Sequence, residues 1–293
     1  MKVGIYGRVL NTENAADFFN HLLAELSKRN IAYTMHEDFV TYLENELNIP
    51  IAAETFASDT NITKIMDVLI SIGGDGTLLD TLSIVRDSGI PVLGINTGRL
   101  GFLASTAKND IENALDELVK GTYTLDKRTV LKLESDKDLF NGLPYALNDF
   151  VLHKKDTSSM ITVHAYLNGE FLNSYWSDGL IVATPTGSSG YSLSCGGPII
   201  FPRSSSFAIT PIAPHNLNVR PIIVSNDNVI SFEVEGRSSS FLATLDSRSE
   251  TIDAKTQIAI RKADFTMNLI RLDKENFLQT LRQKLMWGLD QRN

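Results

Sequence analysis

Residues 68–77 read VLISIGGDGT, a short apolar run that passes into a glycine-rich turn carrying one acidic side chain. Val68–Ile72 has the length of a buried strand, and the leucines that follow at positions 78, 79 and 82 have helical spacing. A strand, a turn and a helix in this order are typical of a layered α/β domain with a mainly parallel sheet. Gly73–Thr77 would then lie at the carboxyl end of a strand, where open α/β sheets bind ligands.

The same alternation of strand and helix patterns extends from residue 1 to about residue 125. We expect strands at Val3–Tyr6 and Pro91–Ile95, and a helix in which Phe19, Leu22, Leu23 and Leu26 share one face. The strand at 91–95 runs into a second polar turn, NTGRLGFL, at residues 96–103. The first part of the chain therefore predicts an open α/β domain with two glycine-containing turns at one sheet edge.

After Thr129 the pattern changes to short strands joined by hairpins. The clearest hairpin has strands at 163–167 and 170–172 around Asn168-Gly169, a pair that supplies the two positive φ values of a type I′ turn. Further strands are expected at 180–183, 222–224, 229–234, 241–245 and 256–261. A helical face at Phe277, Leu278, Leu281 and Leu285 closes the chain, with Gly288 as its C-cap.

Composition narrows the functional classes. The chain has 293 residues, of which 43% are apolar and 21% charged, so it has material for two cores. Its net charge of −8 disfavours a duplex-binding surface, which needs a basic face. No stretch is long and apolar enough for a signal peptide or a membrane helix. The single cysteine, Cys195, allows no intrachain disulfide, and we expect a cytoplasmic protein without membrane or nucleic-acid partners.

The glycine-rich turn at 73–77 has two interpretations. Its backbone N–H groups can face an anion, while Asp75 orients Mg²⁺ or accepts a hydroxyl proton. Alternatively, Asp75 only caps the helix that follows. The turn lacks the Gly-Lys-Ser/Thr of a Walker A loop and does not fit G-x-G-x-x-G, so P-loop and dehydrogenase assignments lose support.

A second polar stretch, SDGLIVATPTGSSGYSLSCGGP, covers residues 177–198. Its hydroxyls, amides and single tyrosine suit sugar and phosphate oxygens and a stacked ring. A flexible linker is the alternative, and Pro185, Tyr191 and Leu193 are unusual in one. Asn148-Asp149 and Asp246-Ser247-Arg248 are ordinary turn sequences by themselves. The five histidines show no zinc-ligand spacing.

Taken together and in order, these motifs resemble the bacterial NAD kinases. The resemblance rests on GGDGT at 73–77, the turn at 96–103, Asn148-Asp149, the stretch 178–198, Asp246-Ser247-Arg248 and the closing LRQKLMWG at 281–288, and it covers essentially the whole chain. It implies an α/β domain over 1–127 plus 271–293, and an all-β sandwich-like, NAD-binding domain over 128–270. The last helix would return to the first domain, and the active site would lie in the crevice between the domains. It also implies the reaction ATP + NAD⁺ → ADP + NADP⁺, with Mg²⁺ carried mainly by ATP, and a homodimer or homotetramer.

The resemblance also implies roles for individual residues. Asp75 would align or deprotonate the 2′-hydroxyl of the adenosine ribose, with Gly74 and Gly76 facing phosphate and Phe102 and Leu103 lining the pocket. Asn148, Asp149 and Asp178 would contact NAD. The residues expected to wrap the dinucleotide are Thr186, Ser189, Gly190, Tyr191, Ser192, Leu193 and Ser194. Ala213 and Arg248 stand where family members touch the cofactor.

The chain departs from the family pattern at two places. Ser189-Gly190-Tyr191 stands where many relatives have Thr-Ala-Tyr, a change that keeps the hydroxyl and the small contact. Trp176 stands where a basic residue often precedes the Asp178 equivalent by two positions, which removes one expected phosphate contact.

Three other interpretations remain open. A diacylglycerol- or sphingosine-type lipid kinase shares the GGDGT turn and the two-domain organisation, but it would need a hydrophobic or basic membrane-facing element. A phosphofructokinase-like sugar kinase shares a Gly-Gly-Asp turn within a different arrangement. A non-catalytic NADP(H)-sensing module could use the same residues without turnover.

Overall fold

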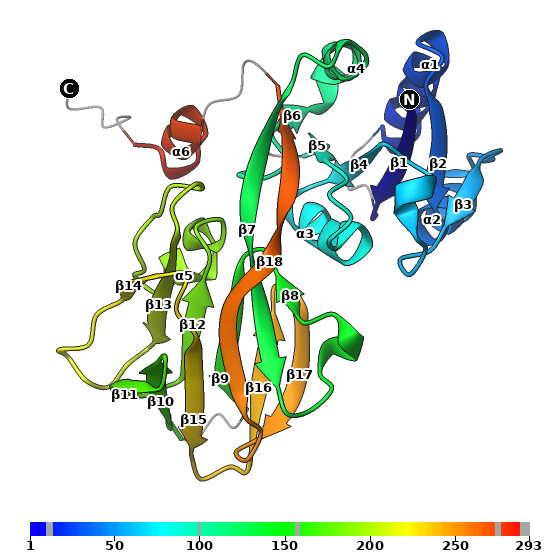
Figure 1. Ribbon diagram of the computed structural model, residues 1–293. Coiled ribbons are helices and arrows are strands. Elements are labelled where there is room, and N and C mark those ends of the chain that lie inside the picture. The colour runs from blue at the N-terminus through cyan, green and yellow to red at the C-terminus, as the bar shows by residue number, and fades with distance from the viewer. Residues whose placement is uncertain (10–13, 99–100, 156–158, 273–276, 288–293) are drawn as a thin grey trace. The chain divides into compact units, whose positions relative to one another are not determined.

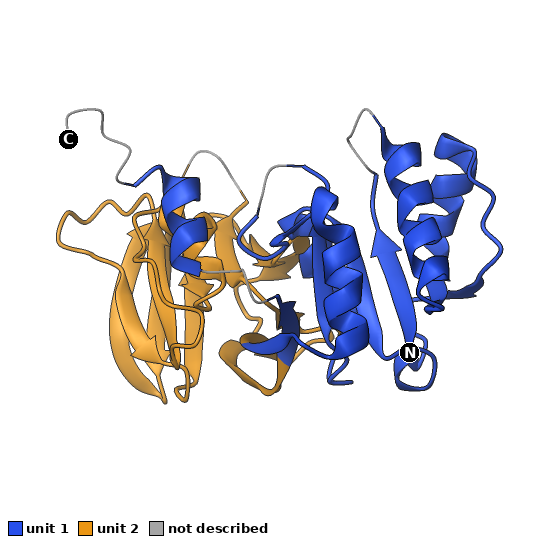
Figure 2. Cartoon of the chain, turned by 90° about the horizontal axis from the view of Figure 1, so that it is seen from above, with its two compact units in different colours: residues 1–127, 267–293 blue, residues 128–266 orange. Residues whose placement is uncertain are grey.

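The computed structural model describes residues 1–9, 14–98, 101–155, 159–272 and 277–287, and its contacts divide the chain into two compact units (Figures 1 and 2). Unit 1 comprises residues 1–127 and 267–293, and unit 2 comprises residues 128–266. The chain passes between the units within β7 (Thr124–Ser135) and again within β18 (Ile258–Arg271).

Unit 1 is built on a parallel sheet. Its strands are β1 (Lys2–Gly7), β2 (Ala32–His36), β3 (Glu54–Phe56), β4 (Val68–Gly73), β5 (Val92–Asn96) and β6 (Thr106–Ala107). The order is β3-β2-β1-β4-β5, with the end of β18 parallel to β5 at Leu269 and Val92. The chain leaves β1 toward one edge and β4 toward the other, so β1 and β4 flank the topological switch point of the sheet.

Helices cover both faces of this sheet. They are α1 (Ala15–Lys28), α2 (Glu37–Leu47), α3 (Asp75–Val85) and α4 (Ile111–Lys120). One core joins α1, α2 and α4 to alternate residues of the central strands, such as Ile5, Ile70 and Ile95. The opposite face receives α3, whose Leu78 lies so close to Gly94 of β5 that a side chain at Gly94 would overlap it. The predicted α/β architecture is confirmed.

Unit 2 is an antiparallel β-sandwich. One sheet contains β8 (Tyr145–Ala146), β10 (Ile161–Leu167), β11 (Glu170–Ser177), β15 (Ile230–Glu235) and parts of β7 and β18. The other contains β9 (Asp149–Lys154), β12 (Gly179–Ala183), β13 (Ser206–Ile212), β14 (Ile222–Ser225), β16 (Ser240–Leu245) and β17 (Arg248–Asp253). Alternate residues of both sheets, including Phe150, Val163 and Phe241, form one core. The predicted hairpin is confirmed, with φ of 50° at Asn168 and 84° at Gly169.

Short helices complete the fold. They are the 3₁₀ turns Ile62–Lys64, Lys108–Asp110, Phe140–Gly142 and Gly187–Ser189, the single turn α5 (Tyr191–Ser194), and the closing helix α6 (Phe277–Leu285). Ile200 and Cys195 pack on the outer face of the second sheet, beside Val151, Ile181 and Ala183, so Cys195 is a small apolar packing residue here. The predicted cap at Gly288 lies outside the described residues.

Candidate active site

Asp75 stands at the switch point of the unit 1 sheet. Gly74 caps α3, and Asp75 is the first helical residue after β4. Gly73 has a φ of 152°, and a side chain there would overlap Thr77. A Cβ on Gly74 or Gly76 would meet no atom within 4 Å, so this side of the turn is open. The first backbone N–H groups of α3 have no partner within the helix and are placed for an anion.

The Asp75 carboxylate does not cap its own helix. It accepts backbone N–H bonds from the next loop, with Oδ2 2.7 Å from the nitrogen of Phe102 and Oδ1 3.0 Å from the nitrogens of Leu103 and Ala104. A side chain at Gly101 would overlap this carboxylate, which explains a glycine there. The helix-cap interpretation of Asp75 is therefore wrong.

These bonds limit what Asp75 can still accept. A carboxylate offers about four acceptor positions, and the backbone of residues 102–104 occupies three of them. The remaining position is on Oδ2, which has one backbone partner. Asp75 can thus hold one further hydrogen-bond donor, such as a hydroxyl, without giving up the loop.

The loop after β5 is also tied from its other side. Arg271 of β18 donates to the Ser105 hydroxyl over 2.6 Å, to Asp126 over 3.3 Å and to the carbonyl of Phe102 over 3.4 Å. The Asn96 amide donates to the carbonyl of Ala104 over 3.2 Å. Within the loop, Leu103 is buried and Phe102 is half-buried, so Phe102 has the more accessible side chain.

In unit 2, Asp246 organises the segment that carries Asn148 and Asp149. Its carboxylate accepts the backbone N–H groups of Leu147 (2.8 Å), Asn148 (2.8 Å) and Asp149 (3.2 Å). The Asp246 nitrogen donates to the Asp149 carbonyl over 3.1 Å. Asp246 has a φ of 51°, a left-handed conformation that is uncommon outside glycine. The sequence pattern around Asp246 indicates no role for it, because its partners are about 100 residues away.

Asp149 is buried, with 6% of its surface exposed, and its side chain has no hydrogen-bond or ion-pair partner among the described residues. Burial, with a smaller effect from the Asp246 charge, raises the pKa of Asp149 to about 7. Burial also raises the pKa of Asp246, but three backbone N–H bonds and Arg248 oppose that effect. We conclude that Asp246 is the member of the pair that ionises first.

The side chain of Arg248 is bound to its own unit. It donates to the carbonyls of Leu143 and Tyr145 and lies 5.8 Å from the centre of the Phe140 ring. These contacts tie the β16–β17 turn to the residues that precede Asn148. Arg248 thereby supports the same segment as Asp246.

The segment 184–190 packs directly against Asn148. The nitrogen and hydroxyl of Thr184 donate to the carbonyls of Asn148 (2.8 Å) and Leu147 (2.6 Å). A side chain at Gly187 would overlap the backbone of Asn148. The Thr186 hydroxyl accepts from the buried Arg128 over 3.1 Å. Thr186 is thus buried, whereas Ser189 and Gly190 keep partly exposed surfaces.

The expected loop at 191–194 is a helical turn. It buries Ser192, whose hydroxyl lies 2.9 Å from that of Thr210, and half-buries Leu193. Tyr191 and Ser194 are exposed. Burial raises the pKa of Tyr191, with added effects of Cys195, Asp178 and Asp149, so its hydroxyl lies within electrostatic range of both aspartates.

Asp178 follows β11 and forms an ion pair with Lys154 of β9 over 2.6 Å. In the register of β12 and β9, Asp149 pairs with Ala183 and His153 with Gly179. The backbones of Asp178 and Asp149 therefore lie at opposite ends of β12, about 16 Å apart along the strand. Besides burial, the charges of both aspartates raise the pKa of Tyr191. Lys154 was not predicted, because only the strand register brings it to Asp178.

Beside Asp178, the exposed ring of Trp176 contacts the ring of His215, with centroids 4.2 Å apart. The His215 nitrogen donates to the Trp176 carbonyl over 2.9 Å. Ala213, at the start of this connection, is exposed and has a φ of 45°. Ala213 and Trp176 thus lie on one rim of unit 2 with Asp178.

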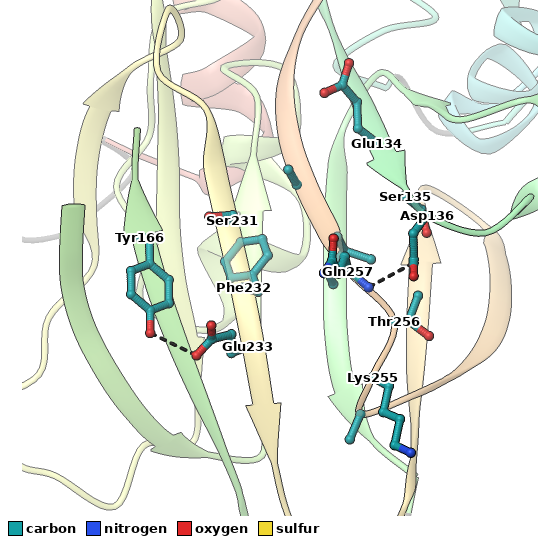
Figure 3. A pocket seen from close by; sticks show the side chains of 13 residues that line it. Glu134, Ser135, Asp136, Tyr166, Ser231, Phe232, Glu233, Lys255, Thr256 and Gln257 are labelled. Atoms are coloured by element: carbon teal, nitrogen blue, oxygen red, sulfur yellow. Dashed lines mark hydrogen bonds between the residues drawn. The ribbon is translucent and has the colours of Figure 1, made fainter. Parts of the chain in front are cut away.

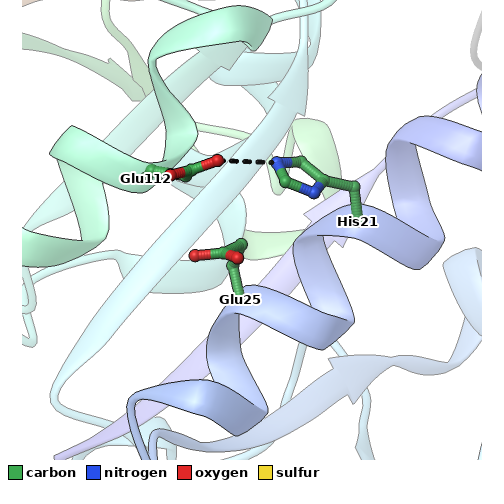
Figure 4. A group of neighbouring side chains, drawn as sticks. All are labelled: His21, Glu25 and Glu112. Atoms are coloured by element: carbon green, nitrogen blue, oxygen red, sulfur yellow. Dashed lines mark ion pairs between the residues drawn. The ribbon is translucent and has the colours of Figure 1, made fainter.

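Two other features lie away from these residues. His21, Glu25 and Glu112 gather between α1 and α4 (Figure 4), but Lys28 and Arg29 already neutralise the Glu25 carboxylate, and Arg29 also binds Asp116. This network joins the two helices. A pocket of about 540 Å³ in unit 2 includes Tyr166, Glu233 and Gln257 (Figure 3). Tyr166 is at the opposite end of β10 from Ile161, which pairs with Ser177 beside Asp178.

Known family models match both parts of the chain. Residues 9–123 match the family model of the ATP-NAD kinase N-terminal domain, and residues 147–272 match that of the ATP-NAD kinase C-terminal domain. The chain belongs to the NAD kinase family. It is 50% identical to the NAD kinase of Cytophaga hutchinsonii and 44% identical to that of Flavobacterium psychrophilum, over the full length of each chain.

Solved structures of the family share the fold. Yeast NADH kinase complexed with NADH superposes with a TM-score of 0.87 at 23% identity, covering 100% of this chain and 89% of the other. An Archaeoglobus fulgidus NAD kinase in complex with ATP gives a TM-score of 0.75 at 24% identity, covering 98% and 99%. In the described part of the chain, no helix has the length and apolar character to span a membrane.

Proposed function

We propose that this protein phosphorylates the 2′-hydroxyl of the adenosine ribose of NAD⁺ with ATP, giving NADP⁺ and ADP. The observation that carries the proposal is Asp75, an aspartate fixed at the switch point of the sheet with one acceptor position left, beside the open N-terminus of α3. Full-length relatives at 44–50% identity named NAD kinase support it.

In the proposed reaction, a bond forms between the ribose O2′ and the γ-phosphorus while the bond to the β,γ-bridging oxygen breaks. Asp75 Oδ2 accepts the hydrogen bond of the 2′-hydroxyl and directs a lone pair of its oxygen toward phosphorus. The proton leaves to Asp75 or to water as the new bond forms. The N–H groups at the start of α3 hold the phosphates, so catalysis rests on alignment and charge stabilisation.

Magnesium ion is the metal that the family implies for ATP. At Asp75 the described residues form no group of three side-chain metal ligands, and the carboxylate has one acceptor position left. This donor set fits a metal held by the ATP phosphates and not by a cluster of protein side chains. When bound, Mg²⁺ would neutralise charge on the phosphate oxygens.

Unit 2 is proposed to hold the dinucleotide. Asn148 and Asp149 would bind ribose hydroxyls, and Asp178 and Tyr191 would contact the remainder of the ligand, with Ser189, Gly190 and Ser194 on the same rim. Asp149 and Asp178 lie at opposite ends of β12, with their backbones about 16 Å apart along the strand, a length suited to an extended dinucleotide. Ser192 is buried and hydrogen-bonded to Thr210, and Leu193 is half-buried, so these two side chains would hold the turn that carries Tyr191 and Ser194.

We further propose a cytoplasmic homo-oligomer. The unpaired Cys195 suits a reducing compartment. Unit 2 exposes Trp176 on the edge strand β11, Ile222 and Ile223 on the edge strand β14 of the other sheet, and Leu217 in the connection before β14. A second copy would cover exposed apolar side chains of this kind.

The test is to incubate the purified protein with NAD⁺, ATP and Mg²⁺ and to measure NADP⁺ with an NADP-specific dehydrogenase. We expect steady NADP⁺ formation that requires all three components. Product absent with ATP, other nucleoside triphosphates and polyphosphate would refute the proposal. NADP(H) binding without turnover would favour a sensing module, and phosphorylation of diacylglycerol or sphingosine would favour a lipid kinase.

A further inference from the structure

The turn between β16 and β17 is bound to the start of β9 more closely than an ordinary hairpin requires. One short side chain, that of Asp246, receives three successive backbone N–H groups at 2.8–3.2 Å, and its own nitrogen closes the ring onto the Asp149 carbonyl. Leu245 pairs with Arg248, so Asp246 and Ser247 form a two-residue hairpin turn, in which a positive φ such as the 51° at Asp246 is common. The feature beyond an ordinary hairpin is the set of three N–H bonds to the Asp246 carboxylate.

What this turn fixes is the segment that presents Asn148 and Asp149. Leu245 pairs with Phe150, so the turn stands directly beside these two residues. Arg248 adds its bonds to the carbonyls of Leu143 and Tyr145 just upstream. The Asn148 carbonyl is held from the other side by Thr184. The backbone at 147–149 is thus held by the β16–β17 turn and by Thr184 after β12. The Asp149 carboxyl is buried and has no hydrogen-bond or ion-pair partner in the described chain.

We propose that Asp246 is a positioning residue for dinucleotide binding, which sets the backbone at 147–149 and aims the unpartnered Asp149 carboxyl at the ligand. This inference rests on the proposed function. Burial raises the pKa of Asp246, and three N–H groups oppose this effect because they stabilise its charged form. A second charge on buried Asp149 is then disfavoured, so below about pH 7 Asp149 carries a proton and donates a hydrogen bond to an oxygen of the bound dinucleotide.

Among the described residues, few titratable groups act on Asp149. Asp246 opposes its ionisation, Arg248 partly offsets the Asp246 charge, and the neutral Tyr191 hydroxyl lies within electrostatic range. NAD⁺ affinity should therefore fall as the pH rises through about 7, where Asp149 loses its proton. ATP affinity should not follow this profile.

The first experiment compares Asp246→Asn with the unmutated protein. We expect the KM for NAD⁺ and the calorimetric Kd for NAD⁺ without ATP to rise about tenfold or more, since a carboxylate that binds buried N–H groups is lost. The KM for ATP should stay within about twofold. Asp253→Asn is the matched control, because Asp253 also accepts a backbone N–H, from Lys255 at 2.9 Å, but at an exposed turn.

The second experiment measures the Kd for NAD⁺ from pH 5.5 to 8.5. The affinity of the unmutated protein for NAD⁺ should fall above pH 7, and Asp246→Asn should shift the midpoint of this fall to lower pH. The affinity of Asp149→Asn should not vary with pH, because the asparagine amide can donate a hydrogen bond at every pH. A flat profile for the unmutated protein, or equal losses for NAD⁺ and ATP in Asp246→Asn, would overturn the inference. If Asp246→Asn does not fold, the Asp149→Asn profile decides. Binding that follows this pattern without NADP⁺ formation would overturn the proposed function and leave the inference standing.

Discussion

Burying Asp149 without a partner should destabilise the protein at neutral and alkaline pH, and Asp149→Asn should relieve that cost. The pKa of Asp149 is raised from 3.8 to about 7 by burial and by Asp246. A raised acid pKa gives a stability contribution that is fully present below 3.8 and is lost as the pH rises through about 7. Linkage puts the accumulated cost at about 2 kcal/mol at pH 5 and about 4 kcal/mol at pH 8.

The assay is urea unfolding at several pH values between 5 and 8. The fluorescence of Trp176 follows the unfolding of unit 2. The parent protein carries Trp287→Phe, so that the other tryptophan of the chain adds no signal. The free energy of unfolding of Asp149→Asn, minus that of its parent, should increase by about 2–3 kcal/mol from pH 5 to pH 8.

Asp138→Asn makes the same substitution at an exposed position of the same unit and serves as the control. The free energy of unfolding of Asp138→Asn, minus that of the parent, should not vary with pH by more than about 0.5 kcal/mol, as is usual for surface substitutions. A pH-independent difference for Asp149→Asn as well would refute the assignment of Asp149 as the buried, protonated member of the pair.

Three further outcomes follow from the structure. Gly101→Ala places a methyl group against the Asp75 carboxylate and should lower kcat at least tenfold. Gly98→Ala is the control, because its Cβ would have only one neighbouring atom, at 3.9 Å, and its kcat should stay within about twofold of the parental value. Equal kcat values for the two variants would exclude the steric argument. Burial lowers the pKa of His36, so its contribution to stability is present above pH 6.5 and should be lost as the pH falls through the lowered pKa. The melting temperature of His36→Asn should therefore depend less on pH between 5 and 7.5 than that of the unmutated protein. An equal fall of both melting temperatures toward low pH would contradict this. Arg271→Gln should free the loop after β5 and reduce kcat about tenfold while the KM for NAD⁺ changes little, which initial-rate kinetics would check.

The parts of the fold that follow from local patterns were predictable. The strand at 68–72, the Asn168-Gly169 hairpin and the helix after Gly76 each have a periodicity or turn chemistry that acts within a few residues. Residues 32–56 were not assigned, although they form β2, α2 and β3. His36 caps helix α2, since its ring nitrogen accepts the N–H of Asp38 over 3.3 Å, and histidine is not a typical capping residue.

The candidate site was predictable as residue types and less so as contacts. The position of Asp75 at a strand end could be read from the glycine-rich turn, but its bonds to residues 102–104 depend on how the loop after β5 folds back. Asp246 looked like an ordinary turn residue because its partners at 147–149 are nearly 100 positions away. Long-range register decides both contacts.

The most direct test of the account is NADP⁺ formation by the unmutated protein and by Asp75→Asn, each with NAD⁺, ATP and Mg²⁺. Asparagine keeps an acceptor for Leu103 and Ala104 but brings an amide NH₂ toward Phe102 and the substrate hydroxyl. We predict NADP⁺ formation by the unmutated protein and a kcat about 10² or more lower in the variant, with calorimetric NAD⁺ binding largely retained. Near-parental turnover by Asp75→Asn, or no NADP⁺ from the unmutated protein, would contradict the account.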